Sequence, residues 1–97
     1  MSENLYSDIY NKALDLISRR EHSVKEVQDK LSRKFDSDET IESVIEKLTL
    51  NNLINDSRFA EMYTRSRKRK GFGPKRIAYE LSIKGVKEYI ASEAIDE

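Results

Sequence analysis

Apolar residues recur along the chain at spacings of three and four positions, which places them on one face of an α-helix. The clearest run is Ile41, Val44, Ile45 and Leu48. No segment shows sustained alternation of apolar and polar residues, so we predict no strands. Six such runs predict six helices and an all-α fold. The runs lie within residues 9–17, 24–35, 41–48, 59–63, 77–81 and 89–94.

Polar residues that favour helix starts precede several of these runs. Ser23 and Glu26 have the spacing of a capping box, in which each side chain bonds the backbone N–H of the other. Ser37 or Asp38 can cap the third helix and Asp56 the fourth, because short oxygen-bearing side chains accept hydrogen bonds from free N–H groups. The caps therefore fall between the apolar runs, as separate helices require.

Glycine and proline mark the ends of the fifth helix. The chain has only three glycines and one proline, so each indicates a real break. Gly73-Pro74 places proline in the first turn, where its missing N–H is harmless. Gly85 can supply the left-handed residue that ends the helix.

The chain repeats itself at an offset of 50 residues. Helical phase alone explains the apolar matches, but it does not explain the shared lysines, caps and linker lengths. We therefore predict two tandem three-helix repeats, residues 1–55 and 56–97, which share a seam and form an elongated helical array. The aligned pairs include Ile9/Phe59, Ala13/Tyr63, Ser23/Gly73, Lys25/Lys75, Val27/Ile77, Leu31/Leu81, Ser32/Ser82 and Lys34/Lys84.

Composition restricts the functional classes. Charged residues and apolar residues each make up 37% of the 97 positions, so the core is thin. The chain has no cysteine, which excludes disulfides and thiolate metal sites. No stretch approaches the ~20 apolar residues of a membrane span, and the polar, acidic N-terminus is unlike a signal peptide. We expect a cytoplasmic protein with no membrane contact.

The net charge of zero conceals an asymmetry. Residues 1–56 hold 8 Lys/Arg against 12 Asp/Glu, whereas residues 57–97 hold 10 against 6. Within residues 65–87 the only acid is Glu80. Helix-end positions favour one or two cations, but five within residues 65–70 exceed that role. One interpretation is that the basic stretch is only a solvated charged face. The other is that it binds an anionic partner, either nucleic acid or an acidic protein. The candidate binding residues are Arg65, Arg67, Lys68, Arg69, Lys70, Lys75, Arg76, Lys84 and Lys87.

Catalysis has little support. The single histidine, His22, lies in a polar turn before a helix cap, where we expect a solvated side chain. No nucleophile, metalloprotease or Walker pattern occurs, and Pro74 removes an N–H that a phosphate-binding loop at Gly71–Lys75 would use. We predict a protein that acts by binding, without a cofactor or metal.

Aromatic residues are interleaved with the basic stretch. Phe59 and Tyr63 have helical spacing and are predicted to lie in the core. Phe72, between two glycines, is the aromatic residue that we expect to be exposed, or alternatively to fill the seam between repeats. An exposed aromatic beside cations would suit base stacking with a single strand.

Three blocks of sequence resemble the RecX family. Ala13 through Glu26 is similar to the opening of a RecX repeat, and Leu53–Ala60 is similar to the junction between the first and second repeats. Gly73–Ile77 followed by Glu80–Val86 resembles the family's Gly-Pro, Glu-Leu and Lys-Gly signature. The blocks occur in the family's order and spacing over nearly the whole chain.

The resemblance implies a regulatory function. RecX proteins are bacterial regulators in DNA repair and recombination that bind the RecA recombinase and its filament on single-stranded DNA. They generally inhibit strand exchange and ATP hydrolysis. They usually have three tandem repeats lying in the filament groove, whereas this chain has two. The resemblance implies that the face of residues 65–87 docks in the groove of the filament, and we expect a monomer.

Two other binding functions remain open. A helix-turn-helix domain that binds duplex DNA suits three-helix units, although Lys75, Arg76 and Glu80 are few residues for base recognition. A helical adaptor for an acidic protein would need no nucleic acid.

Overall fold

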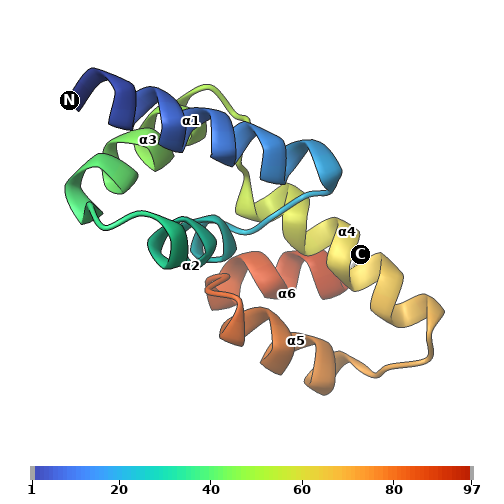
Figure 1. The fold of residues 1–97 in the computed structure, drawn as a ribbon. Coiled ribbons are helices and arrows are strands. Elements are labelled where there is room, and N and C mark those ends of the chain that lie inside the picture. The colour runs from blue at the N-terminus through green and yellow to red at the C-terminus, as the bar shows by residue number, and fades with distance from the viewer. Residues whose placement is uncertain (1, 97) are drawn as a thin grey trace.

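The computed structural model describes residues 2–96 and contains six α-helices and no strand within that range (Figure 1). This confirms the all-α fold. The helices are α1 (Ser2–Arg19), α2 (Val24–Lys34), α3 (Asp38–Leu50), α4 (Asp56–Arg69), α5 (Pro74–Ile83) and α6 (Glu88–Asp96).

The buried side chains form two separate clusters, one for each group of three helices. Helices α1, α2 and α3 enclose Ile9, Ala13, Val27, Leu31, Ile41, Val44, Leu48 and Ile54. Helices α4, α5 and α6 enclose Phe59, Ala60, Ile77, Leu81, Val86, Ala91 and Ala94. The second cluster contains three alanines, so its side chains bury less apolar surface than those of the first.

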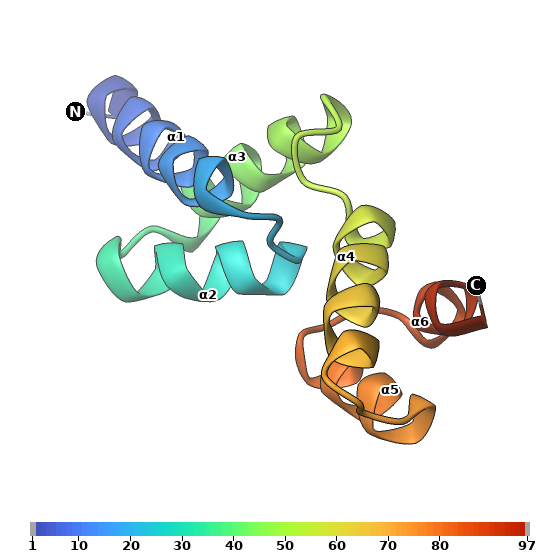
Figure 2. The ribbon, with the colours of Figure 1, turned by 90° about the vertical axis from the view of Figure 1, so that its right-hand side faces the viewer.

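The two groups lie end to end and give the molecule principal extents of 48 × 22 × 20 Å. Figures 1 and 2 show α1–α3 at one end and α4–α6 at the other, with α2 and α5 along one side. The segment 51–55 joins the groups, and Asn52 within it has a positive φ of 61°. The shape agrees with the predicted elongated array.

Most of the predicted helix boundaries are confirmed. The Ser23 side chain accepts from the Glu26 N–H and the Glu26 carboxylate accepts from the Ser23 N–H, each at 3.1 Å. Pro74 opens α5, and Gly85 follows it with φ of 81°. Ser37 precedes α3, but its hydroxyl donates to the Thr40 hydroxyl and caps no backbone group.

The predicted cap of α4 is wrong. Asn55, not Asp56, is the N-cap, and its side chain accepts from the Arg58 N–H at 2.9 Å. Asp56 is the first helical residue, and its carboxylate accepts instead from the Val24 N–H at the start of α2, also at 2.9 Å. Both residue types are suitable caps, and the Asp56 carboxylate is used for the contact with α2.

The seam between the repeats is built from polar contacts. The Ser23 hydroxyl donates to the Lys84 carbonyl at 2.8 Å, and the Lys84 ammonium lies 3.2 Å from the Glu26 carboxylate. Burial raises the pKa of Glu26, but hydrogen bonds from Arg20 and the Ser23 N–H outweigh it and lower the pKa to about 2. The Glu26 carboxylate therefore stays charged and joins the two repeats at neutral pH.

Gly85 lets the two repeats approach closely at this seam. Its φ of 81° lies in the left-handed region that side chains rarely adopt. A Cβ at this position would stand 2.7 Å from the Lys25 Cβ, which is closer than van der Waals contact allows. Glycine at position 85 therefore meets two requirements: the left-handed backbone that ends α5, and the close approach to Lys25 of α2.

Candidate binding surface of the second repeat

The end of α4 presents cations to solvent. Arg69 and Lys70 are exposed, and the Lys70 N–H closes the helix through carbonyls of its last turn. Lys75 is exposed at the start of α5. These three side chains are free to meet an anionic partner.

Two of the other predicted binding residues, Arg67 and Arg76, are held by Glu80. The Arg67 guanidinium donates twice to the Glu80 carboxylate, at 2.8 and 2.9 Å, and Arg76 donates once at 2.9 Å. The hydrogen bonds from Arg76 and then Arg67 hold the pKa of Glu80 at about 2. The Tyr63 hydroxyl donates to the same carboxylate. Arg67 is only 19% exposed, so it serves packing within the repeat, whereas Arg76 keeps most of its surface in solvent.

Phe72 corrects the expectation of an exposed ring. It is half-buried and packs against the second core, away from the seam. Arg67 lies over the ring with its guanidinium carbon 3.8 Å from the centroid, and Arg76 lies 5.0 Å away. The exposed aromatic of α5 is Tyr79, at 65%.

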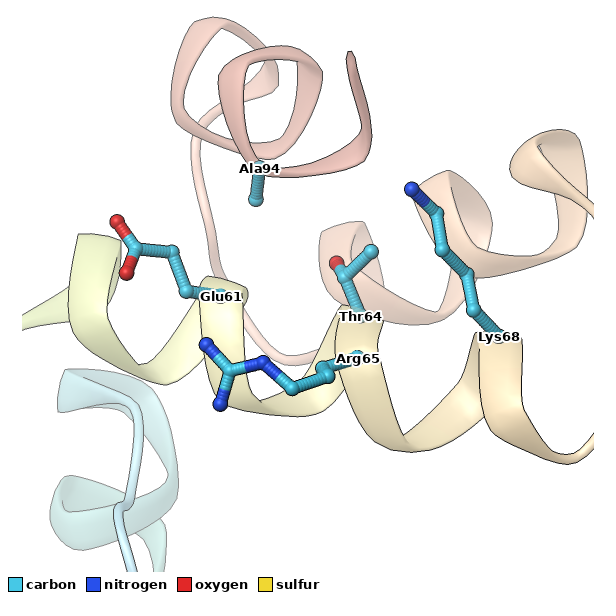
Figure 3. Close-up of a pocket in the computed structure, with 5 residues that line it drawn as sticks. All are labelled: Glu61, Thr64, Arg65, Lys68 and Ala94. Atoms are coloured by element: carbon cyan, nitrogen blue, oxygen red, sulfur yellow. The ribbon is translucent and has the colours of Figure 1, made fainter. Parts of the chain in front are cut away.

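Arg65 and Lys68 line a cavity of about 290 Å³ between α4 and α6 (Figure 3). Lys68 donates to the Ile95 carbonyl at 2.8 Å, while the buried Thr64 hydroxyl has no partner within residues 2–96. Glu61 faces the same space, so its carboxylate opposes an anion there. The cavity is therefore a packing gap of mixed charge.

The two remaining candidates lie at the seam. Lys84 is half-buried, and its ammonium is held by Glu26. Lys87 lines an open groove between the repeats together with carboxylates of Asp38, Glu42 and Asp56. The nine predicted cations thus do not form one face. They lie in four regions: the end of α4 with the adjoining start of α5, the Glu80 cluster, the α4–α6 cavity and the seam.

His22 is buried, contrary to the expectation of a solvated turn residue. It is 3% exposed, and its Nε2 lies 3.0 Å from the Lys30 ammonium. An ammonium only donates, so Nε2 accepts and Nδ1 carries the proton that it donates to the Arg20 carbonyl at 2.9 Å. Burial lowers the pKa of this imidazole, which favours the neutral form.

Comparison with known proteins shows the same two units. Residues 10–48 match the family described as RecX, first three-helix domain, and residues 55–95 match RecX, second three-helix domain. The chain belongs to the RecX family. One relative is the "Regulatory protein RecX" of Prosthecochloris aestuarii, which is 44% identical over 98 residues. The match covers 100% of this chain and 65% of that relative. The "Regulatory protein RecX" of Haemophilus ducreyi is 40% identical over 86 residues, with 88% of this chain and 56% of the relative covered.

Solved RecX structures share the fold. The crystal structure of RecX from Lactobacillus salivarius has a TM-score of 0.88 and 36% identity, over 98% of this chain and 62% of that one. A second crystal structure of regulatory protein RecX has a TM-score of 0.87 and 26% identity, over 94% and 45%. This chain therefore spans less than two thirds of each of these RecX proteins. Both curated relatives are named as regulatory proteins. Within residues 2–96, no helix has the length and hydrophobicity to cross a membrane.

Proposed function

We propose that this chain regulates the RecA recombinase by binding its filaments on single-stranded DNA, and that binding inhibits strand exchange and ATP hydrolysis. Membership of the RecX family over both three-helix units carries the proposal. The relatives are named regulatory proteins, which supports action by binding.

The exposed cations of the second repeat supply the charge for such a complex. Arg69, Lys70 and Lys75 face solvent, and the repeat has an excess of positive charge. Each phosphate neutralised on a single strand contributes about 0.7 to the slope of log affinity against log salt. Two such contacts, made by Arg69 and Lys70 at the end of α4, would give a slope of about 1.4.

The test measures ATP hydrolysis by RecA on single-stranded DNA while the purified chain is titrated in. We expect hydrolysis to fall as the chain is added. The variant with Arg69, Lys70 and Lys75 changed to Ala should inhibit only at higher concentration, and its binding should depend less steeply on salt. Arg67 is left intact, because its removal would disturb the Glu80 cluster.

A matched control changes three exposed cations of the first repeat, Arg19, Lys34 and Lys47, to Ala. This control carries the same change of net charge and should inhibit like the unaltered chain. Hydrolysis that is unaffected by the unaltered chain would refute the proposal. Equal loss of inhibition in both variants would show that total charge, not the second repeat, governs binding.

A further inference from the structure

Because the two repeats share one fold, comparing their equivalent positions shows which exposed residues that fold requires. Three side chains of the second repeat are apolar and largely exposed: Tyr79 at 65%, Ile83 at 56% and Tyr89 at 64%. At the equivalent positions of the first repeat, 50 residues earlier, the chain has Asp29, Arg33 and Glu39. The three-helix unit therefore forms with charged residues at all three positions.

Two of these apolar side chains, Tyr79 and Ile83, lie in a row with Lys75 along α5. Lys75, Tyr79 and Ile83 are spaced four residues apart and so lie along one face of the helix. We call these three residues the α5 stripe. From Lys75 to Ile83 the stripe is about 12 Å long at 1.5 Å per residue. This spacing of anchor residues is typical of helices that insert into grooves of other proteins.

The far end of the stripe opens on a basic cleft. Ile83 is one wall of a cleft of about 240 Å³ between α2 and α5. Four cations and two carboxylates complete the lining: Lys25, Lys30, Arg33, Lys84, Glu26 and Asp29. Each carboxylate already has a partner, since Asp29 pairs with Lys25 and Glu26 with Lys84. Arg33 forms no ion pair within residues 2–96, so the cleft has capacity for an added carboxylate.

We propose that the α5 stripe is a protein-docking surface, which fits an apolar groove with carboxylates at its rim. Tyr79 and Ile83 fill the groove, while Lys75 at one end and the basic cleft at the other meet the carboxylates. Resting on the proposed function, this inference assigns the stripe to the protein part of the RecA filament, and the exposed cations at the end of α4 to its DNA. Tyrosine is enriched at the centres of protein interfaces, and isoleucine has no π-face on which a base could stack.

The test exchanges the stripe for the residues of the first repeat. The double substitution Tyr79→Asp and Ile83→Arg leaves the net charge unchanged, so it removes apolar contact without altering total charge. We expect affinity for RecA filaments assembled on oligo(dT) to fall at least tenfold. Affinity for oligo(dT) alone should change less than twofold, and thermal unfolding should match that of the unaltered chain.

Two further variants complete the design. Leu50→Asp places a charge on another exposed apolar residue, 76% exposed at the end of α3, and should leave filament binding unchanged. If the double variant unfolds, Tyr79→Ala with Ile83→Ala keeps good helix formers and should still weaken filament binding.

The outcomes separate the two proposals. If the unaltered chain does not bind filaments, the proposed function fails and the docking assignment fails with it. If it binds and both stripe variants bind equally well, the assignment alone is overturned. If the stripe variant also loses affinity for oligo(dT), the stripe binds nucleic acid and the assignment to protein is overturned. An equal loss of filament binding by Leu50→Asp would overturn the assignment as well.

Discussion

A neutral imidazole holds the turn between α1 and α2. His22 links the Arg20 carbonyl at 2.9 Å to the Lys30 ammonium at 3.0 Å, and the ring is almost fully buried. A second proton on the ring would bring an imidazolium against an ammonium. The sequence alone could not reveal this, because the neighbours of His22 in the chain are polar and its partner Lys30 lies two helical turns away.

Stability should therefore fall in mild acid. The pKa of His22 is lowered in the folded chain from its ordinary value of 6.5, so the neutral form stabilises the fold above that pH. Below about pH 6.5 the unfolded chain takes up a proton that the folded chain resists, and the free energy of unfolding decreases until the lowered pKa is reached. Denaturant unfolding between pH 7.5 and 5 should show this loss, and His22→Gln should flatten it.

The same pKa can be measured directly by NMR, because the chain contains a single histidine. A His22 pKa at or above 6.5 in the folded protein would contradict the assigned hydrogen bonds.

Packing of α4 against α6 leaves an unsatisfied group. The Thr64 hydroxyl is buried without a partner within residues 2–96, next to the α4–α6 cavity. The equivalent residue of the first repeat is Leu14, which packs against that repeat's core. A buried hydroxyl without a hydrogen-bond partner lowers the free energy of unfolding, because it loses its hydrogen bonds to water and gains none in the protein.

Replacing the hydroxyl by a methyl group should stabilise this pair of helices. Thr64→Val keeps the side-chain shape, and we expect a gain of about 1 kcal/mol, which corresponds to a rise in Tm of about 4–8 °C for a domain of this size. Thr49→Val is the control, because the Thr49 hydroxyl already donates to the Ile45 carbonyl at 2.8 Å and is exposed. A Tm for Thr64→Val at or below that of the unaltered chain would show that the hydroxyl has a partner in solution.

The helices themselves follow from local signals, whereas the placement of charges does not. Apolar spacing, the capping box at Ser23 and the break at Gly73-Pro74 are encoded within a few residues, so the six helices could be predicted. The basic stretch was predicted as one candidate surface. Arg67 turns inward to Glu80 because α4 packs against α5, and this pairing depends on tertiary structure. Arg76 pairs with Glu80 four residues along α5 and stays 61% exposed, so that pair is a local signal within the sequence. The exposure of Tyr79 was also missed, although its counterpart Asp29 was a usable signal.

The packing of the two repeats against each other depends on the close contact at Gly85. Gly85→Ala should destabilise the protein in two ways: about 1–2 kcal/mol from the left-handed backbone and a further ~1–3 kcal/mol from overlap with Lys25. Gly71→Ala is the matched control. Its φ of 92° is equally unfavourable for alanine, but no atom lies within 4 Å of the added Cβ. Denaturant unfolding of both variants separates the two effects.

Equal destabilisation of the two variants would mean that the repeats are not in contact at Gly85 in solution. A larger loss for Gly85→Ala, at an unchanged helix content, is the expected result.

The seam also determines how units can be added to the array. On the side of the first repeat, the hydrogen-bond donors of the seam are the Ser23 hydroxyl and the Val24 N–H at the start of α2. At the start of α5 the equivalent residues are Gly73, which has no hydroxyl, and Pro74, which has no N–H. Arg76 likewise stands where the seam has Glu26, so the charge is reversed. A unit that packs on α5 must use different contacts, and copies of this chain cannot stack through repeated copies of the seam into an open-ended fibre.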